Sequence, residues 1–286
     1  MKNLKVTFIQ SNLLWENKAE NLKQFSEKID VISESTDLII LPEMFTTGFS
    51  MSPEKLSDTM TGETIQWMRM KAKQKQCVIT GSFICEEHGK YYNRLVWMKA
   101  DGTYETYDKR HLFRIAGEDT HYTEGKEKLI IELNGWKICP LVCYDLRFPV
   151  WSRNKLIEKN IPLQPLIQTL PPSQAQTYKG ESPYDYDLLI YVANWPERRS
   201  HHWKTLLLAR AIENQCYVVG LNRVGDDGNE IHYSGDSAVI NAKGEVISKI
   251  NTNKEIIETV ELNFSELQEF RKQFPVFLDA DNFELK

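Results

Sequence analysis

The sequence predicts an α/β fold in which helices cover a pair of mixed sheets. Strand and helix patterns alternate along the first half of the chain, and two β-hairpin patterns follow in the middle. With 286 residues, of which 41% are hydrophobic, the chain is long enough to bury one substantial core. We therefore predict a single catalytic domain over residues 1–286.

The first half begins with a strand at 5–10, an amphipathic helix over about 17–33 and a continuous apolar strand at 37–41. A second helix is predicted over about 62–76, because Ile65, Met68 and Ala72 fall on one face. A strand at 77–83 follows it. This order favours a sheet covered by helices.

Two hairpins are predicted in the middle of the chain. Strands at 94–99 and 103–107 flank an Ala-Asp-Gly turn, and strands at 129–133 and 136–142 flank an Asn-Gly turn. The last of these strands leads directly into Cys143.

The second half adds a buried strand at 187–193, a helix over about 201–215 with Ser200 as its N-cap, and a strand at 216–222. Two short strands at 237–240 and 245–250, a strand at 255–262 and a polar C-terminal helix complete the pattern. A pair of mixed sheets is the expected outcome.

One segment, 155–186, breaks the pattern with five prolines and little periodicity. Such a composition predicts a long surface loop, which we interpret as an insertion. Its functional interpretation is a lid over a site. We prefer a tolerated excursion or a contact surface between subunits.

Composition excludes several classes of function. A net charge of -5 and a pI near 5.8 provide no basic surface for nucleic acid. No apolar run reaches the length of a membrane span, and the N-terminus turns polar too early for a signal peptide. The five cysteines are odd in number and lack a CxxC pair, which indicates reduced thiols in the cytoplasm and no zinc site.

Three reactive side chains follow predicted strand ends: Glu43, Lys109 and Cys143. A free thiol has a pKa of about 8.5 and needs a base, a role that Glu43 can fill. Lys109, with the backbone N–H of Tyr144, can hold an oxyanion. Alone, each residue has an ordinary explanation, as a solvated cap, a charged loop or an inert core thiol. Together they predict an acyl-transfer site.

The motifs around these residues resemble those of a known superfamily. LPEMF at 41–45, DKRHLF at 108–113 and LVCYDLRFP at 141–149 resemble the Glu, Lys and Cys signatures of the carbon-nitrogen hydrolase (nitrilase) superfamily. YVANWP at 191–196 and ARAIEN at 209–214 resemble its omega-amidase branch. The resemblance implies a four-layer αββα sandwich with two mixed sheets, in which Cys143 is the nucleophile, Glu43 the general base and Lys109 the oxyanion stabiliser. It implies no cofactor or metal.

The superfamily also uses a second active-site glutamate, which we assign to Glu118, nine positions after Lys109. Glu124 is the alternative, and an exposed loop acid is the ordinary explanation of Glu118. The Pro-rich stretch after Asn154 departs from the family pattern and leaves access to the site and subunit assembly open.

Three further residues are candidates for substrate binding. Arg147 can bind a carboxylate through two hydrogen bonds, although a structural ion pair with Asp145 is an equal alternative. Phe113 and Trp195 follow strand ends near the proposed site. They either line the pocket or are ordinary aromatic residues at its rim.

The omega-amidase resemblance implies hydrolysis of 2-oxoglutaramate or 2-oxosuccinamate, with water, to the 2-oxo acid and ammonia. Residue spacing leaves another small amide, a carbamoyl compound or a nitrile as alternative substrates. A cysteine-dependent acyl transferase and a non-catalytic scaffold of the same fold also remain open. We expect a homodimer that acts on a small molecule.

Overall fold

The computed structural model describes residues 2–154, 184–249, 252–281 and 283. Its strands are β1 (Leu4–Gln10), β2 (Leu38–Ile40), β3 (Val78–Glu87), β4 (Lys90–Met98), β5 (Tyr104–Asp108), β6 (Ile131–Leu133), β7 (Trp136–Val142), β8 (Leu188–Ala193), β9 (Tyr217–Asn222), β10 (Val224–Asp226), β11 (His232–Ser234), β12 (Ala238–Ile240) and β13 (Ile256–Leu262). Its α-helices are α1 (Lys18–Asp30), α2 (Pro53–Leu56), α3 (Glu63–Lys75), α4 (Glu118–His121), α5 (Pro149–Ser152), α6 (Ser200–Asn214) and α7 (Phe264–Gln273). The short 3-10 turns are η1 (Arg114–Ala116), η2 (Cys143–Arg147), η4 (Glu197–Arg199) and η5 (Val276–Asp279).

The strands form two mixed sheets, as predicted. The six-stranded sheet has the order β13-β1-β2-β3-β4-β5, and its parallel strands β1, β2 and β3 are extended by antiparallel neighbours. The five-stranded sheet has the order β12-β9-β8-β7-β6, with β7, β8 and β9 parallel. Strands β10 and β11 form a separate ribbon. Both predicted hairpins are present, as β4–β5 and β6–β7.

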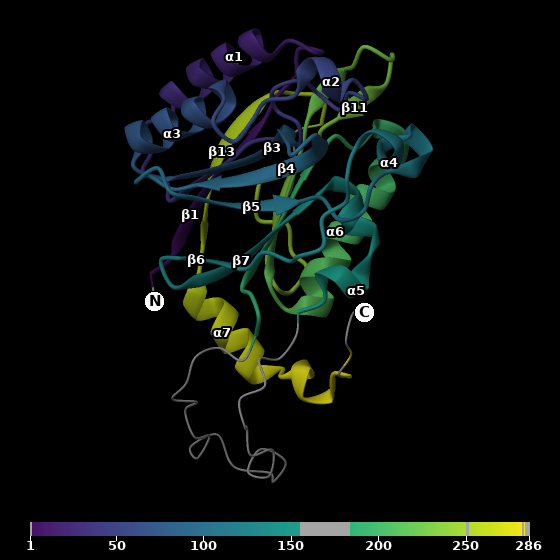
Figure 1. Cartoon of the computed structure of the whole chain (residues 1–286). Helices are drawn as coiled ribbons and strands as arrows, with labels where there is room; N and C mark the ends of the chain where they lie inside the picture. The colour runs from purple at the N-terminus through teal and green to yellow at the C-terminus, as the bar shows by residue number, and fades with distance from the viewer. Residues whose placement is uncertain (1, 155–183, 250–251, 282, 284–286) are drawn as a thin grey trace, which may run out of the picture.

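The two sheets pack face to face between layers of helices (Figure 1). Side chains of β2 alternate between the two sides of its sheet. Leu38 and Ile40 belong to the core shared with the five-stranded sheet, whereas Ile39 packs with Phe25 of α1 and Met68 of α3. On the far side, α6 covers the five-stranded sheet. The predicted αββα sandwich is confirmed.

The start of α6 differs from the prediction. Ser200 is the first residue of the helix, and Arg199 occupies the cap position. The turn η4 runs directly into α6, which moves the cap one residue upstream. The Ser200 hydroxyl donates to Asp236 Oδ2 at 2.7 Å, so it serves a tertiary contact and not the helix end.

The strand predicted at 245–250 is also wrong within the described residues up to 249. Only an isolated bridge joins Ile240 to Val246, and Ile247 N donates to the Val239 carbonyl at 2.8 Å. The Val239 N–H donates to the Ser248 hydroxyl at 2.9 Å. Because a side chain takes this backbone donor, the ladder does not continue.

The segment 155–186 was predicted to be a surface loop, and most of it, 155–183, lies outside the described residues. Its end is not at the surface. Tyr184 and Tyr186 are 5% and 0% exposed. The Tyr184 hydroxyl donates to Gln215 at 2.8 Å, and the Arg271 guanidinium stacks on the Tyr184 ring. Aromatic burial therefore anchors this end of the segment to the core.

The contact between α6 and β9 leaves no room for a side chain at Gly220. A Cβ there would lie 2.4 Å from Leu207 Cδ1 and 3.0 Å from the Trp203 ring. We expect Gly220→Ala to lower the free energy of unfolding by about 1–3 kcal/mol, measured by urea denaturation. In a Leu207→Ala background, which removes the two nearest atoms, the same substitution should be less destabilising. Equal effects in both backgrounds would contradict this packing account.

Candidate active site

The candidate site forms where strands of both sheets end. Strands β2 and β5 run in the same direction, so Glu43 and Lys109 follow their carboxyl ends at one edge of the six-stranded sheet. Cys143 and Asn194 follow the parallel strands β7 and β8 in the same way. Face-to-face packing brings the four residues together.

Cys143 lies at the sharp turn from β7 into η2. Its φ of 44° is in the left-handed region, which is uncommon for residues other than glycine and costs on the order of 1–3 kcal/mol. The residue is 9% exposed, and its thiol donates to the Asn194 carbonyl at 3.8 Å. The next N–H, of Tyr144, belongs to the first turn of η2, where backbone donors have no partner within the helix.

Lys109 is buried between two carboxylates. Its Nζ lies 2.9 Å from Glu43 Oε1 and 2.9 Å from both carboxylate oxygens of Glu118. The Asn93 amide donates to the same two carboxylates, at 2.8 Å to Glu43 and 3.2 Å to Glu118. One ammonium thus neutralises only one of two carboxylates. The structure places Glu118 against Lys109, whereas the alternative, Glu124, is exposed.

Glu43 joins the two sheets. While Oε1 accepts from Lys109 and Asn93, Oε2 accepts from the backbone N–H of Asn194 at 2.7 Å. The Asn194 side-chain amide donates to the Glu43 carbonyl at 2.7 Å. The carboxylate is therefore held in one orientation by groups from both sheets.

Burial and charge determine the resting protonation states. Burial, together with the negative charges of Glu43 and Glu118, raises the pKa of Cys143 well above its ordinary value, although Lys109 opposes this shift. Burial works against the ammonium of Lys109, but Glu118 and Glu43 outweigh it and raise the pKa of Lys109. Burial also raises the pKa of Glu118. The resting thiol is neutral and must give its proton to a base when it attacks.

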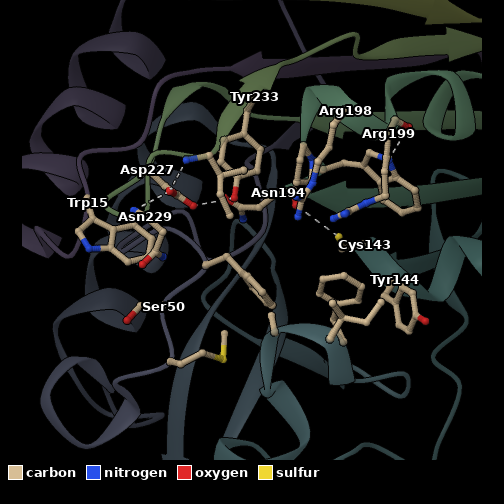
Figure 2. A pocket seen from close by; sticks show the side chains of 18 of the residues that line it. Trp15, Ser50, Cys143, Tyr144, Asn194, Arg198, Arg199, Asp227, Asn229 and Tyr233 are labelled. Atoms are coloured by element: carbon tan, nitrogen blue, oxygen red, sulfur yellow. Dashed lines mark hydrogen bonds between the residues drawn. The ribbon is translucent and has the colours of Figure 1, made fainter.

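A cavity of about 510 Å³ opens over Cys143 (Figure 2). Lys109, Phe113, Tyr144, Arg147 and Trp195 are among the residues that line it. The other lining residues are Trp15, Glu16, Phe49–Ser52, Ile115, Ala116, Asn194, Pro196, Arg198, Arg199, Asp227, Asn229, Ile231 and Tyr233. Within the described ranges, no group of three or more His, Cys, Asp or Glu side chains is arranged to hold a metal.

Arg147 does not form the alternative ion pair with Asp145. Its Nη2 lies 3.0 Å from Nδ1 of His202, and its guanidinium lies over the Trp195 ring at 4.9 Å. Arg147 lines the cavity.

Asp145 is fully buried beneath the Cys143 turn. It accepts hydrogen bonds from the Tyr107 hydroxyl at 2.8 Å, the Val142 N–H at 3.0 Å and the His111 N–H at 3.1 Å. His111 Nδ1 lies 2.7 Å from the same carboxylate. Asp145 thus ties the turn that carries the thiol to β5, in the other sheet.

Sequence reasoning missed Asn93, Asp145 and Asn194. Asn194 directly follows β8 as Cys143 follows β7, so the same strand-end argument would have found it. Asn93 fell just outside the strand predicted at 94–99, and a lone amide in an apolar hairpin carries no chemical signature. Apart from the Val142 N–H, the donors to Asp145 come from Tyr107 and His111, which are distant in the chain, and the sequence carries no signal of those contacts.

Comparisons with known proteins agree with this geometry. Residues 5–272 match the carbon-nitrogen hydrolase family model. The chain is 44% identical to omega-amidase YafV of Escherichia coli (strain K12), over 100% of both chains. It is 30% identical to the 2-oxoglutaramate amidase of Bacillus subtilis (strain 168), over 96% of both.

Solved structures show the same fold. XC1258 from Xanthomonas campestris, a CN-hydrolase superfamily protein with an arsenic adduct in its active site, matches with a TM-score of 0.90, 40% identity and full coverage of both chains. Nit3 of Saccharomyces cerevisiae, a member of branch 10 of the nitrilase superfamily, matches with a TM-score of 0.76 at 22% identity, over 96% of this chain and 95% of its own. The resemblance predicted from the three motifs is confirmed.

The buried hydrogen bonds that Asp145 accepts should contribute to the stability of the fold. In Asp145→Asn, an amide NH2 would face donors that now reach a carboxylate, leaving buried groups unpaired. We expect the free energy of unfolding to fall by about 1–3 kcal/mol in urea denaturation. Asp119→Asn is the control, because Asp119 has a 3.5 Å contact with the exposed Arg114 and should shift stability by about 0.5 kcal/mol or less. Similar changes in both variants would refute a special role for Asp145.

Proposed function

Because the chain belongs to the carbon-nitrogen hydrolase family, we propose that it is an omega-amidase. It hydrolyses the terminal amide of a small carboxylate, 2-oxoglutaramate or 2-oxosuccinamate, to the 2-oxo acid and ammonia. The observation that carries this proposal is that Cys143 and Lys109 line one cavity and that the buried carboxylate of Glu43 lies 2.9 Å from Lys109 Nζ. The full-length similarity to an omega-amidase supports the choice of substrate.

The first half of the reaction forms a thioester. Cys143 Sγ attacks the carboxamide carbon while its proton passes to the carboxylate of Glu43. When the tetrahedral intermediate collapses, Glu43 returns the proton to the departing nitrogen, and the C–N bond breaks to release ammonia. The raised pKa of Cys143 fits a thiol that is deprotonated during attack.

The negative oxygen of the intermediate needs donors that are already in place. Lys109 Nζ and the Tyr144 N–H are the groups we assign to it. Removal of one such donor typically lowers kcat by roughly 100- to 1000-fold. Glu118 and Asn93 act as positioning residues, because they hold the ammonium of Lys109 and the carboxylate of Glu43.

The second half of the reaction consumes water. Glu43 takes a proton from a water molecule, whose oxygen attacks the thioester carbon. The C–S bond breaks, the acid leaves, and the proton returns to Cys143. Another small amide, a carbamoyl compound or a nitrile would use the same nucleophile, so substrate tests decide among them. In an acyl transferase, an amine would attack the thioester in place of water. A non-catalytic scaffold would form no thioester.

We also propose a cytoplasmic homodimer. All five cysteines are buried and free, which fits a reducing compartment. Among the described residues, no helix has the length and apolar character to cross a bilayer. The dimer is an expectation for folds of this type, and sedimentation equilibrium of the purified chain tests it.

The proposal predicts ammonia release from 2-oxoglutaramate that depends on Cys143. Cys143→Ala should abolish release and leave the thermal unfolding profile cooperative, because the substitution removes only the thiol. Ammonia is measured beside glutamine, asparagine and a simple nitrile. Turnover of another of these alone would keep the mechanism and discard the substrate, and activity in Cys143→Ala would refute the mechanism.

The two glutamates after Lys109 should behave differently. Glu118→Gln should lower kcat roughly 100-fold, because Lys109 loses the carboxylate that positions it. The negative charge of Glu118 raises the pKa of Cys143, so removing it should move iodoacetamide alkylation of Cys143 to lower pH. Glu124→Gln, at an exposed position, is the matched control and should change neither quantity. An unshifted alkylation profile in Glu118→Gln would contradict the electrostatic account.

A further inference from the structure

Lys109 lies between two residues that both bind the carboxylate of Asp145. Tyr107, two positions before Lys109, donates its hydroxyl to Asp145 Oδ2 at 2.8 Å. His111, two positions after Lys109, donates its backbone N–H to Asp145 Oδ1 at 3.1 Å, and its Nδ1 lies 2.7 Å from the same oxygen. The chain on both sides of Lys109 is therefore fastened to one buried carboxylate.

The same carboxylate holds the turn that carries the thiol. Asp145 belongs to η2, with Tyr144 between it and Cys143, and its Oδ2 accepts from the Val142 N–H at 3.0 Å. A residue such as Cys143, with a φ of 44°, keeps its strained conformation only when its surroundings fix it. Asp145 thus fixes the strained turn from within and binds the loop of Lys109 across the two sheets.

His111 contacts this turn in two ways. An ionised carboxylate only accepts hydrogen bonds, so His111 Nδ1 carries a proton and donates it to Asp145. The imidazole also stacks on Phe148, which follows η2, with ring centroids 3.8 Å apart and an angle of 8° between the planes. Phe148 in turn meets the Tyr144 ring edge-on at 5.1 Å. Because His111 is only half-buried, it can be substituted without opening the core.

We propose that His111 is a positioning residue, which acts through Asp145 to set the separation between the two oxyanion donors, Lys109 Nζ and the Tyr144 N–H. These donors follow strands of different sheets, β5 and β7. Both must lie about 3 Å from the developing oxyanion. The inference rests on the oxyanion assignment within the proposed function and not on the identity of the amide substrate.

The contacts of Asp145 differ in kind from those of the two active-site glutamates. Glu43 and Glu118 bind the ammonium at the tip of Lys109 and so orient its side chain. Tyr107 and His111 instead hold the backbone from which that side chain extends. Loss of the contacts to Asp145 would let this backbone move relative to the thiol turn, and a displacement of about 1 Å can lower a rate roughly 100-fold.

Two substitutions of His111 separate its hydrogen bond from its stacking. His111→Phe keeps a planar ring against Phe148 and removes the Nδ1 donor. His111→Asn removes the ring and keeps a donor, because Nδ2 of asparagine and Nδ1 of histidine are both bonded to Cγ. We expect His111→Phe to lower kcat for 2-oxoglutaramate roughly 10- to 100-fold with KM within about 3-fold, and His111→Asn to recover most of this loss. His121→Phe, at an exposed position of α4, is the control and should change neither constant.

A second measurement reports on the oxyanion donors without turnover. The probe is propanal, a small uncharged aldehyde to which the thiol of Cys143 adds. A C–S bond forms, and the thiol proton ends on the former carbonyl oxygen, the atom that Lys109 and the Tyr144 N–H would hold. Propanal affinity is measured as protection of Cys143 from alkylation by iodoacetamide. In His111→Phe it should fall by about the same factor as kcat, because the adduct and the transition state use the same donors.

Tyr107→Phe removes the donor on the other side of Lys109 and provides a second, independent variant. It should lower kcat and propanal affinity together, as His111→Phe does. Tyr104→Phe is its matched control on the same strand, since Tyr104 is 38% exposed and should leave both quantities unchanged. The pair keeps the inference testable if His111→Phe does not fold.

The outcomes separate a positioning role from a purely structural one. Unchanged kcat and propanal affinity in folded His111→Phe would overturn the inference, even if its free energy of unfolding fell. Equal losses in His111→Asn and His111→Phe would also overturn it, because the hydrogen bond to Asp145 would then not matter. Absence of 2-oxoglutaramate hydrolysis by the wild type, with propanal affinity still dependent on His111, would reject the proposed substrate and retain the positioning role.

Discussion

The structure depends on one buried arrangement of charge, the contact of Glu43 with both sheets. One carboxylate oxygen faces Lys109 and Asn93 of the six-stranded sheet, and the other faces Asn194 of the five-stranded sheet. A buried carboxylate is tolerated only when its charge and hydrogen bonds are satisfied. This contact joins the two sheets beside the cavity, and the negative charge of Glu43 adds to burial in raising the pKa of the Cys143 thiol.

The two sheets supply different reacting groups to the site. The six-stranded sheet supplies the acid-base and cationic groups from antiparallel and parallel strand ends, in a dry interior. The five-stranded sheet supplies the thiol and backbone donors from a strained turn. Asp145 then connects that turn back to β5 of the first sheet through Tyr107. Each sheet thus orients residues of the other.

Residues marked by a local sequence pattern were predicted, whereas residues whose role depends on contacts between distant parts of the chain were missed. Apolar runs followed by charged turns placed Glu43, Lys109 and Cys143 at strand ends, and these positions agree with the structure. Asn93 could not be found in this way, because its role arises only when Glu43 and Glu118 meet beside it. Ser200 has the usual cap chemistry, but Asp236, distant in sequence, competes for its hydroxyl. Pro-rich surroundings predicted exposure for Tyr186, whereas packing within the core determines its burial.

The left-handed backbone of Cys143 has an evolutionary consequence. Glycine and asparagine adopt this conformation with less strain than a thiol-bearing residue, so the nucleophile occupies a position at which its replacement relieves the backbone. Replacement of Cys143 by glycine would relieve this backbone strain and at the same time remove the nucleophile, so stability and turnover favour different residues at this position. A lineage freed from the need to hydrolyse amides would be expected to lose its cysteine early and to keep its fold.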